Sequence, residues 1–140
     1  MCQNILIIGD SGVGKTNIIN RLLNKSFNNL FIPNEFTKVH KIKDTEINIY
    51  DYPGQLKFMP IFPLGITKVI IVYDMTSRLS YKNIIGWQNL FKECVHNDIP
   101  YLIVGNKSDS KNVKISTGIT ISAKTNHNLD LITDFITTRQ

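Results

Sequence analysis

The feature that most constrains the fold is a glycine-rich segment, residues 9–16, which directly follows an apolar run at residues 4–8. It reads GDSGVGKT and matches the G-x-x-x-x-G-K-[ST] pattern of a phosphate-binding loop between a buried strand and a helix. Glycines let backbone N–H groups turn inward around phosphate oxygens, and a helix N-terminus favours the same negative charge. Lys15 can reach the β- and γ-phosphates, and the Thr16 hydroxyl can ligate Mg²⁺. This context favours a nucleotide site over an ordinary surface turn. The predicted contacts are Gly9, Asp10, Ser11, Gly12, Val13, Gly14, Lys15, Thr16 and Asn17.

The rest of the chain alternates predicted strands with predicted helices, which is typical of a parallel sheet covered by helices. We therefore expect one domain over residues 1–140, with an α/β doubly wound, mostly parallel sheet and helices on both faces. In such sheets, ligands bind at the carboxyl ends of the strands. Strands are predicted at residues 4–8, 38–42, 46–50, 68–73, 101–104 and 119–121, and helices from about residue 15, at 80–96 and around Leu129, Ile132 and Ile136.

A second motif, DYPGQ at residues 51–55, comes at the end of a predicted strand. At such a position the Asp51 carboxylate can hold Mg²⁺ through a water, and the Gly54 amide can approach a γ-phosphate. Taken alone, D-x-x-G is a common turn sequence. Its place at a strand end therefore gives this motif its weight.

A third motif, NKSD at residues 106–109, follows the strand predicted at 101–104 and points to the base. The Asp109 carboxylate can accept from two adjacent N–H donors, which guanine presents at N1 and N2. Adenine has a lone pair at N1, so the same carboxylate would repel it. Asn106 can tie neighbouring loops together, and the Lys107 stem can lie over the purine face. These residues favour guanine over adenine.

A short segment, Ser122-Ala123-Lys124, follows the last predicted strand. The backbone N–H of Ala123 can donate to guanine O6. Without the other motifs, this segment would be read as a polar loop before the last helix. Its interpretation as a base contact therefore depends on the motifs that precede it.

In this order, GDSGVGKT, DYPGQ, VYDMTSRLSY, VGNKSD and SAK resemble the small GTPases of the Ras superfamily, and the Rab branch most closely. The resemblance covers nearly the whole chain and implies a small G domain of the P-loop NTPase type. It implies a switch that binds GTP or GDP with Mg²⁺ and meets regulators or effectors. Phe27 could face the guanine or simply pack at the end of the first helix. Outside the phosphate loop, the implied nucleotide contacts are Phe27, Gly54, Asn106, Lys107, Asp109, Ser122, Ala123 and Lys124.

The implied metal site departs from the family pattern. The family places a Mg²⁺-binding threonine in switch I, and an alignment without gaps puts Asn34 there, with Thr37 three residues later as the alternative. An asparagine amide oxygen can coordinate a hard cation. The implied metal ligands are therefore Thr16, Asp51 and Asn34.

The segment between Asp109 and Ser122 is also shorter than in the family. A parallel crossover normally needs a dozen or more residues and usually contains a helix. We therefore expect this helix to be missing, which would leave part of one sheet face uncovered.

Hydrolysis of GTP follows as a hypothesis, with Gln55 and Lys15 as the catalytic residues. Gln55 stands at the position where the family orients the attacking water, and Lys15 would neutralise charge on the transferred group. Arg21, Arg78 and Arg139 are expected to be solvated or packed along their stems, away from the γ-phosphate. The intrinsic rate should therefore be slow, with room for an activator's arginine.

Composition excludes several other classes of protein. The net charge is +5 and the pI is near 9.3, but the lysines are scattered, so we expect no nucleic-acid binding. No apolar stretch approaches the roughly 20 residues that span a membrane. Two distant cysteines read as free thiols in a reducing cytoplasm. The last residues, TTRQ, lack prenylation cysteines, so we expect no stable membrane anchor by that route, and a monomer.

Two alternatives to a working GTPase stay open on the sequence. One is a degenerate module that binds guanine nucleotide, hydrolyses it poorly and acts as an interaction protein or as a decoy for GTPase regulators; Asn34 and the lost segments favour it. The other is a P-loop ATPase or kinase, which Asp109 disfavours. Competition between ATP and GTP would separate the ATPase reading from the others.

Overall fold

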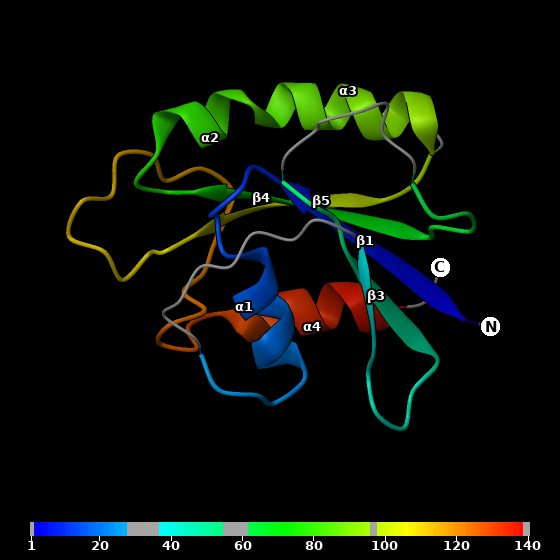
Figure 1. Ribbon diagram of the computed structural model, residues 1–140. Coiled ribbons are helices and arrows are strands. Elements are labelled where there is room, and N and C mark those ends of the chain that lie inside the picture. Colours follow the sequence, from blue (N-terminus) through cyan, green and yellow to red (C-terminus); the bar gives the residue numbers. More distant parts are fainter. Residues whose placement is uncertain (1, 28–36, 55–61, 96–97, 139–140) are drawn as a thin grey trace.

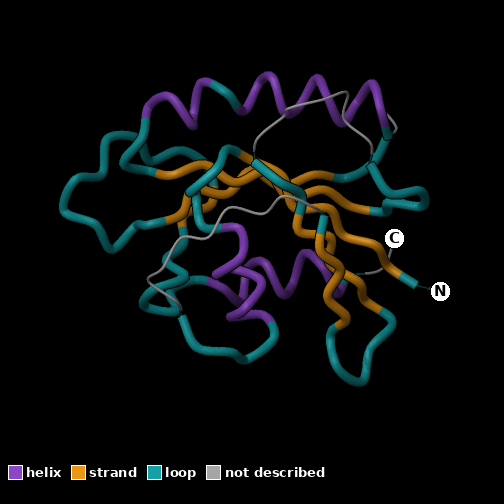
Figure 2. The backbone as a smooth tube through the Cα atoms, viewed as in Figure 1, coloured by secondary structure: helices purple, strands orange, loops and turns teal. Residues whose placement is uncertain are grey.

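The chain folds around a six-stranded sheet with the strand order β2-β3-β1-β4-β5-β6. The computed structural model describes residues 2–27, 37–54, 62–95 and 98–138. Figure 1 shows the sheet between two layers of helices, and Figure 2 shows the same backbone by type of structure. In chain order the elements are β1 (Gln3–Gly9), α1 (Lys15–Leu22), β2 (Lys38–Lys41), β3 (Ile47–Asp51), β4 (Lys68–Asp74), α2 (Arg78–Lys82), α3 (Ile84–Cys94), β5 (Tyr101–Asn106), β6 (Ile119–Thr120) and α4 (Leu129–Thr137).

All strand pairs are parallel except β2 with β3, which are antiparallel. The turn between β2 and β3 contains Asp44 in a left-handed conformation, with φ of 61°. The central strands β1 and β4 consist largely of buried isoleucine, leucine and valine, as expected of strands covered on both faces. The α/β class and the mostly parallel sheet predicted from the sequence are therefore confirmed.

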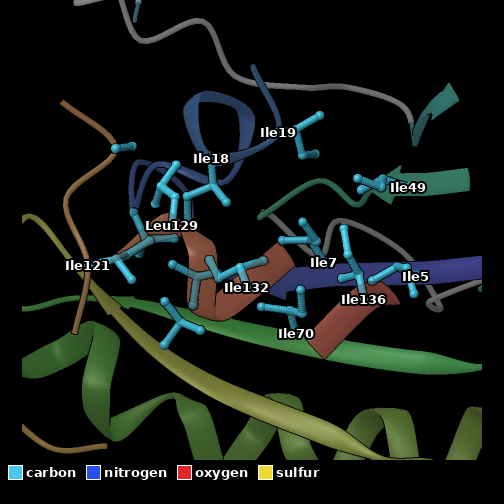
Figure 3. Close-up of a cluster of buried hydrophobic side chains, with 14 of the residues drawn as sticks. Ile5, Ile7, Ile18, Ile19, Ile49, Ile70, Ile121, Leu129, Ile132 and Ile136 are labelled. Atoms are coloured by element: carbon cyan, nitrogen blue, oxygen red, sulfur yellow. The ribbon is translucent and has the colours of Figure 1, made fainter. Parts of the chain in front are cut away.

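Two hydrophobic clusters lie on opposite faces of the sheet. One, here called the aliphatic cluster, packs beneath α1 and α4 and includes the side chains labelled in Figure 3. The other, here called the aromatic cluster, packs beneath α3. The aliphatic cluster is built from Ile5, Ile7, Val13, Ile18, Ile19, Ile47, Ile49, Ile70, Val72, Val104, Ile121, Ala123, Leu129, Ile132 and Ile136. The aromatic cluster is built from Leu6, Ile8, Tyr52, Phe62, Ile66, Val69, Ile71, Tyr73, Met75, Ile84, Trp87 and Phe91.

The helix predicted at residues 80–96 is wrong in its bounds. Two helices meet at Asn83, and the first begins before residue 80, because the Ser77 side chain caps it by accepting a hydrogen bond from the backbone N–H of Ser80 at 3.2 Å. Such a cap satisfies a backbone donor that the helix leaves open, and it fixes the start of the helix. The second helix, α3, ends at Cys94.

The helix expected to be missing between β5 and β6 is indeed absent, since residues 107–118 are all described and contain neither helix nor strand. This segment is instead a loop with turns at residues 108–109 and 111–112. The Tyr73 hydroxyl donates to the Thr117 carbonyl at 2.7 Å and accepts from the Thr117 N–H at 3.0 Å. Ile115 packs against the aromatic cluster, while Tyr101 on β5 stays 40% exposed. The missing helix therefore leaves this edge of the sheet only partly covered.

Candidate functional site

The predicted motifs gather at one edge of the sheet, because each follows the carboxyl end of a parallel strand. The segments after β1, β3, β5 and β6 all begin there, which is where ligands bind in doubly wound sheets. Gly14 caps α1 in a left-handed conformation, with φ of 102°, and no side chain among the described residues makes a capping hydrogen bond to this helix. The start of α1, where the phosphates are expected, is thus formed by a glycine in a conformation that other residues rarely adopt.

The Lys15 side chain bonds to the loop between β1 and α1. Its ammonium donates to the carbonyl oxygens of Gly9 at 2.7 Å and Asp10 at 2.8 Å. Burial lowers the pKa of Lys15 to about 8, although the carboxylates of Asp51 and Asp10 act to raise it. A phosphate ligand beside this ammonium would favour its charged form.

Thr16 and Asp51 come together where a metal is expected. The Thr16 hydroxyl donates to Asp51 Oδ2 at 2.7 Å. The other oxygen, Asp51 Oδ1, is buried and has no hydrogen-bond partner among the residues that the structure describes. A hydroxyl beside a carboxylate with an open oxygen fits Mg²⁺, which binds through few protein oxygens, several waters and substrate phosphates.

The DYPGQ segment approaches the phosphate loop closely at Gly54. A Cβ atom on Gly54 would lie 2.3 Å from the backbone nitrogen of Ser11, so no larger residue fits without a shift. Gln55 and Asn34 lie outside the described residues, and Thr37, the alternative to Asn34, is half-buried just before β2. The predictions for these switch residues stay predictions.

Asn106 ties the base motif to the phosphate loop. Its Nδ2 donates to the Val13 carbonyl at 2.9 Å, and its Oδ1 accepts from the Ala123 N–H at 3.1 Å. The contact needs glycine at position 14, because a Cβ there would lie 2.3 Å from Asn106 Nδ2. One buried amide therefore joins three of the predicted motifs.

Asp109 and Ser122 form a second link between the base motifs. The Ser122 hydroxyl donates to Asp109 Oδ1 at 2.6 Å and accepts from the Thr125 N–H at 3.1 Å. This bond fixes the direction of the carboxylate predicted to read guanine. Lys124 is exposed, and Phe27 is half-buried against the aliphatic cluster. Whether Phe27 also faces the guanine stays a prediction.

Lys107 contacts both the phosphate loop and β4. Its ammonium donates to the Gly12 carbonyl at 2.9 Å and to Asp74 Oδ2 at 2.8 Å. Burial alone would raise the pKa of Asp74, but hydrogen bonds from Lys107 and Thr76 outweigh it and hold that pKa below its usual value. The role of Asp74 was missed, although its place at the end of β4, inside the VYDMTSRLSY segment, was a signal.

The expectation that Arg21 is merely solvated or stem-packed is wrong. From α1, its Nε donates to the Ala123 carbonyl at 2.7 Å and its Nη2 to the Lys124 carbonyl at 2.8 Å. Two parallel donors of one guanidinium suit two successive carbonyls, which a lysine cannot match. Arg21 thus supports the loop that carries the predicted base contacts.

Sequence reasoning also missed the partners of the Asp10 side chain. Asn83 Nδ2 donates to Asp10 Oδ2 at 2.7 Å, and Trp87 Nε1 donates to Asp10 Oδ1 at 2.8 Å. Trp87 was read from the sequence only as part of an apolar helix face. Nothing in a helical hydrophobic pattern signals a polar contact to a loop so far away in sequence.

Comparison with known proteins identifies the family to which the chain is similar. A family model described as Ras family matches residues 4–136. The chain is 37% identical over 123 residues to Ras-related protein Rab-11C of Dictyostelium discoideum, with 75% of this chain and 51% of that protein covered. It is 36% identical over 115 residues to Ras-related protein Rab-13 of Canis lupus familiaris, covering 75% and 56%. It is 32% identical over 155 aligned positions to GTP-binding nuclear protein GSP1 of Encephalitozoon cuniculi, covering 94% and 72%.

These comparisons bear on one of the alternatives that the sequence leaves open. The chain spans about half the length of the Rab relatives described above. The comparisons give no support to the alternative of a degenerate decoy. Separately, none of the helices in the described part of the chain is long and apolar enough to cross a membrane.

Proposed function

This chain belongs to the Ras family, and we propose that it is a Rab-like small GTPase that binds GTP and GDP with Mg²⁺ and switches between these two states. The observation that carries the proposal is the Asn106 amide, which joins the phosphate loop at Val13 to the base loop at Ala123. Phosphate and base motifs held by one buried side chain suit a ligand that spans both, namely a nucleotide.

The preference for guanine rests on Asp109 and its surroundings. The carboxylate is oriented by the Ser122 hydroxyl at 2.6 Å, and the neighbouring Lys107 side chain is fixed by Gly12 and Asp74. A carboxylate held in one direction can accept from both N–H groups of guanine, and it leaves adenine without a matching donor. GTP and GDP should therefore compete for the site far better than ATP.

The phosphates would lie against the amides of residues 9–16 and the N-terminus of α1, with Lys15 beside them. Thr16 and Asp51 would hold Mg²⁺, which supplies positive charge against the β- and γ-phosphates. Lys15 would exchange its bonds to the Gly9 and Asp10 carbonyls for phosphate oxygens, at a site where burial strengthens the attraction. Gly54 would bring its backbone N–H to the γ-phosphate.

Hydrolysis requires an oriented water, and we assign that role to Gln55, which would position the nucleophile rather than deprotonate it. Arg21 is held by the Ala123 and Lys124 carbonyls, so it is not available to the γ-phosphate. The intrinsic rate should therefore be slow, and an activator's arginine would raise it by about 10³–10⁵-fold. We further propose that such regulators and effectors meet the chain in the cytoplasm, where the exposed Cys2 and Cys94 stay reduced.

The experiment that tests this function is single-turnover GTP hydrolysis by the purified protein, with Mg²⁺ and with EDTA. We expect slow, Mg²⁺-dependent release of phosphate, abolished by Gln55→Leu with GDP binding intact. The Gln88→Leu variant, on α3, is the matched control and should hydrolyse at the parental rate. Phosphate release that Gln55→Leu does not slow would contradict the assignment, and equal competition by ATP would contradict the guanine specificity.

A further inference from the structure

The first turn of α3 holds the side chain of Asp10 by both of its oxygens. Asn83, at the junction of α2 and α3, donates from Nδ2 to Oδ2 at 2.7 Å, and Trp87 donates from Nε1 to Oδ1 at 2.8 Å. The two donors are four residues apart and so lie on one face of the helix. Trp87 is 5% exposed, so its position is fixed by packing in the aromatic cluster.

The main chain of Asp10 is part of the phosphate loop. Its carbonyl accepts from the Lys15 ammonium at 2.8 Å. The next residue, Ser11, lies against Gly54, where even a Cβ atom would come within 2.3 Å of the Ser11 nitrogen. The side chain that α3 holds therefore belongs to a residue whose backbone places both Lys15 and the contact with Gly54.

Trp87 also touches the segment that follows β3. Its ring meets that of Tyr52 edge-on, with centroids 6.2 Å apart, and Tyr52 packs on Phe62 at 4.6 Å. Tyr52 lies between Asp51 and Gly54 in the chain. Trp87 is thus packed between the two segments predicted to surround the γ-phosphate.

We propose that Asn83 and Trp87 are positioning residues for phosphate binding: by holding the Asp10 carboxylate, they fix the backbone of the phosphate loop in the shape that receives the nucleotide. The inference rests on the proposed nucleotide binding and adds residues that touch neither phosphate nor metal. Hydrogen bonds to a charged group are stronger than those between neutral groups. The loss of one such bond to Asp10 should therefore measurably weaken nucleotide binding by the phosphate loop.

The test is the rate at which the protein releases a fluorescent ribose-labelled GDP in Mg²⁺ when excess GDP is added. Asn83→Ala removes one donor at a position whose backbone, φ −74° and ψ −9°, suits alanine. Trp87→Phe removes the other donor and keeps an aromatic ring in place. We expect each variant to release GDP about tenfold faster than the parent. Asn89→Ala, an exposed asparagine on the same helix, is the matched control and should release GDP at the parental rate.

A double-mutant cycle separates positioning from general loss of stability. If Asn83 acts through Asp10, then Asn83→Ala should change the release rate less than about twofold when Asp10→Ala is already present. A merely structural role would instead lower the thermal midpoint of all these variants and leave GDP release unchanged. Each variant is therefore also melted without added nucleotide.

The outcomes for the two proposals are distinguishable. Parental GDP release from both Asn83→Ala and Trp87→Phe, in a parent that binds GDP, would overturn the positioning role and leave the proposed function standing. A tenfold effect of Asn83→Ala that persists in the Asp10→Ala background would also overturn it. A parent that binds no labelled GDP would overturn the proposed function and the inference together.

Discussion

The two faces of the sheet are built from different chemistry. Among the described residues, the buried members of the aliphatic cluster under α1 and α4 are all isoleucine, leucine, valine or alanine. The aromatic cluster under α3 contains five aromatic residues in the described part of the chain. Two of these make hydrogen bonds beyond the cluster: Trp87 to Asp10, and Tyr73 to Thr117. Aromatic residues with a polar end can be buried and still make a directed hydrogen bond. The comparison suggests that one face mainly stabilises the fold, while the other also shapes the site.

The largest effect on stability is expected from Ile70→Ala, in the middle of β4 and fully buried in the aliphatic cluster. The loss of its side chain should lower the free energy of unfolding by about 3–4 kcal/mol, because transfer and cavity terms add. GDP release from the folded protein should stay within about twofold of the parent, since Ile70 makes no directed bond to the site. Urea unfolding and the GDP-release assay measure the two effects.

The control for this prediction is Ile85→Ala on α3, where the side chain is 66% exposed and the change should stay within about 0.5 kcal/mol. If Ile70→Ala accelerated GDP release as strongly as Asn83→Ala, the aliphatic face would also shape the site, and the proposed difference between the two faces would be wrong.

Arg21 is an exception to this difference between the faces, because it reaches the site from α1 on the aliphatic side. Arg21→Ala should speed GDP release about tenfold, since the Ala123 and Lys124 carbonyls lose charged donors that hold the base loop. Arg21→Lys should recover only part of this, because an ammonium cannot match the planar fork. Arg78→Ala, exposed on α2, is the matched control. Unchanged GDP release from Arg21→Ala would confine site support to the aromatic side.

The sequence predicted the fold and the location of the motifs because both depend on local signals. Apolar runs separated by turns give the strands, and a motif that follows a strand is carried to the edge where all parallel strands end. The absence of a helix between Asp109 and Ser122 was predicted because that segment is shorter than in the family that the sequence resembles. The link from Asn106 to the neighbouring loops was also predicted, whereas the phosphate contacts of Lys15 stay predictions.

The contacts made by Arg21, Asn83 and Trp87 could not be predicted in the same way. Arg21 bonds to a carbonyl 102 residues away, and Trp87 to a carboxylate 77 residues away. Both residues also fit an ordinary amphipathic helix, so the hydrophobic pattern is the same with or without these contacts. Only the packing of helix against sheet decides which loop atom each side chain meets.

The smallest expected effect concerns Asp74, at the end of β4 beside the start of α2. Asp74→Asn removes the charge that pairs with Lys107 at 2.8 Å and keeps the shape of the side chain. We expect a loss of about 1 kcal/mol of unfolding free energy near neutral pH, because the Lys107 side chain is 41% exposed and solvent weakens the pair. Urea unfolding at several pH values measures it, with Asp134→Asn, exposed on α4, as control.

The pH dependence identifies the charge as the cause. Hydrogen bonds from Lys107 and Thr76 outweigh the effect of burial and depress the pKa of Asp74 in the folded state. A depressed carboxyl pKa contributes stability that is fully present above the unfolded value, about 3.9, and is lost as the pH falls through the folded value. The difference between parent and Asp74→Asn should therefore be constant from about pH 7 to about pH 5 and shrink below about pH 4. If the difference in unfolding free energy between parent and Asp74→Asn stayed constant down to about pH 3, the charge pair with Lys107 would not be its cause. The difference would then be assigned to the neutral hydrogen bonds from Thr76, through which Asp74 would position α2.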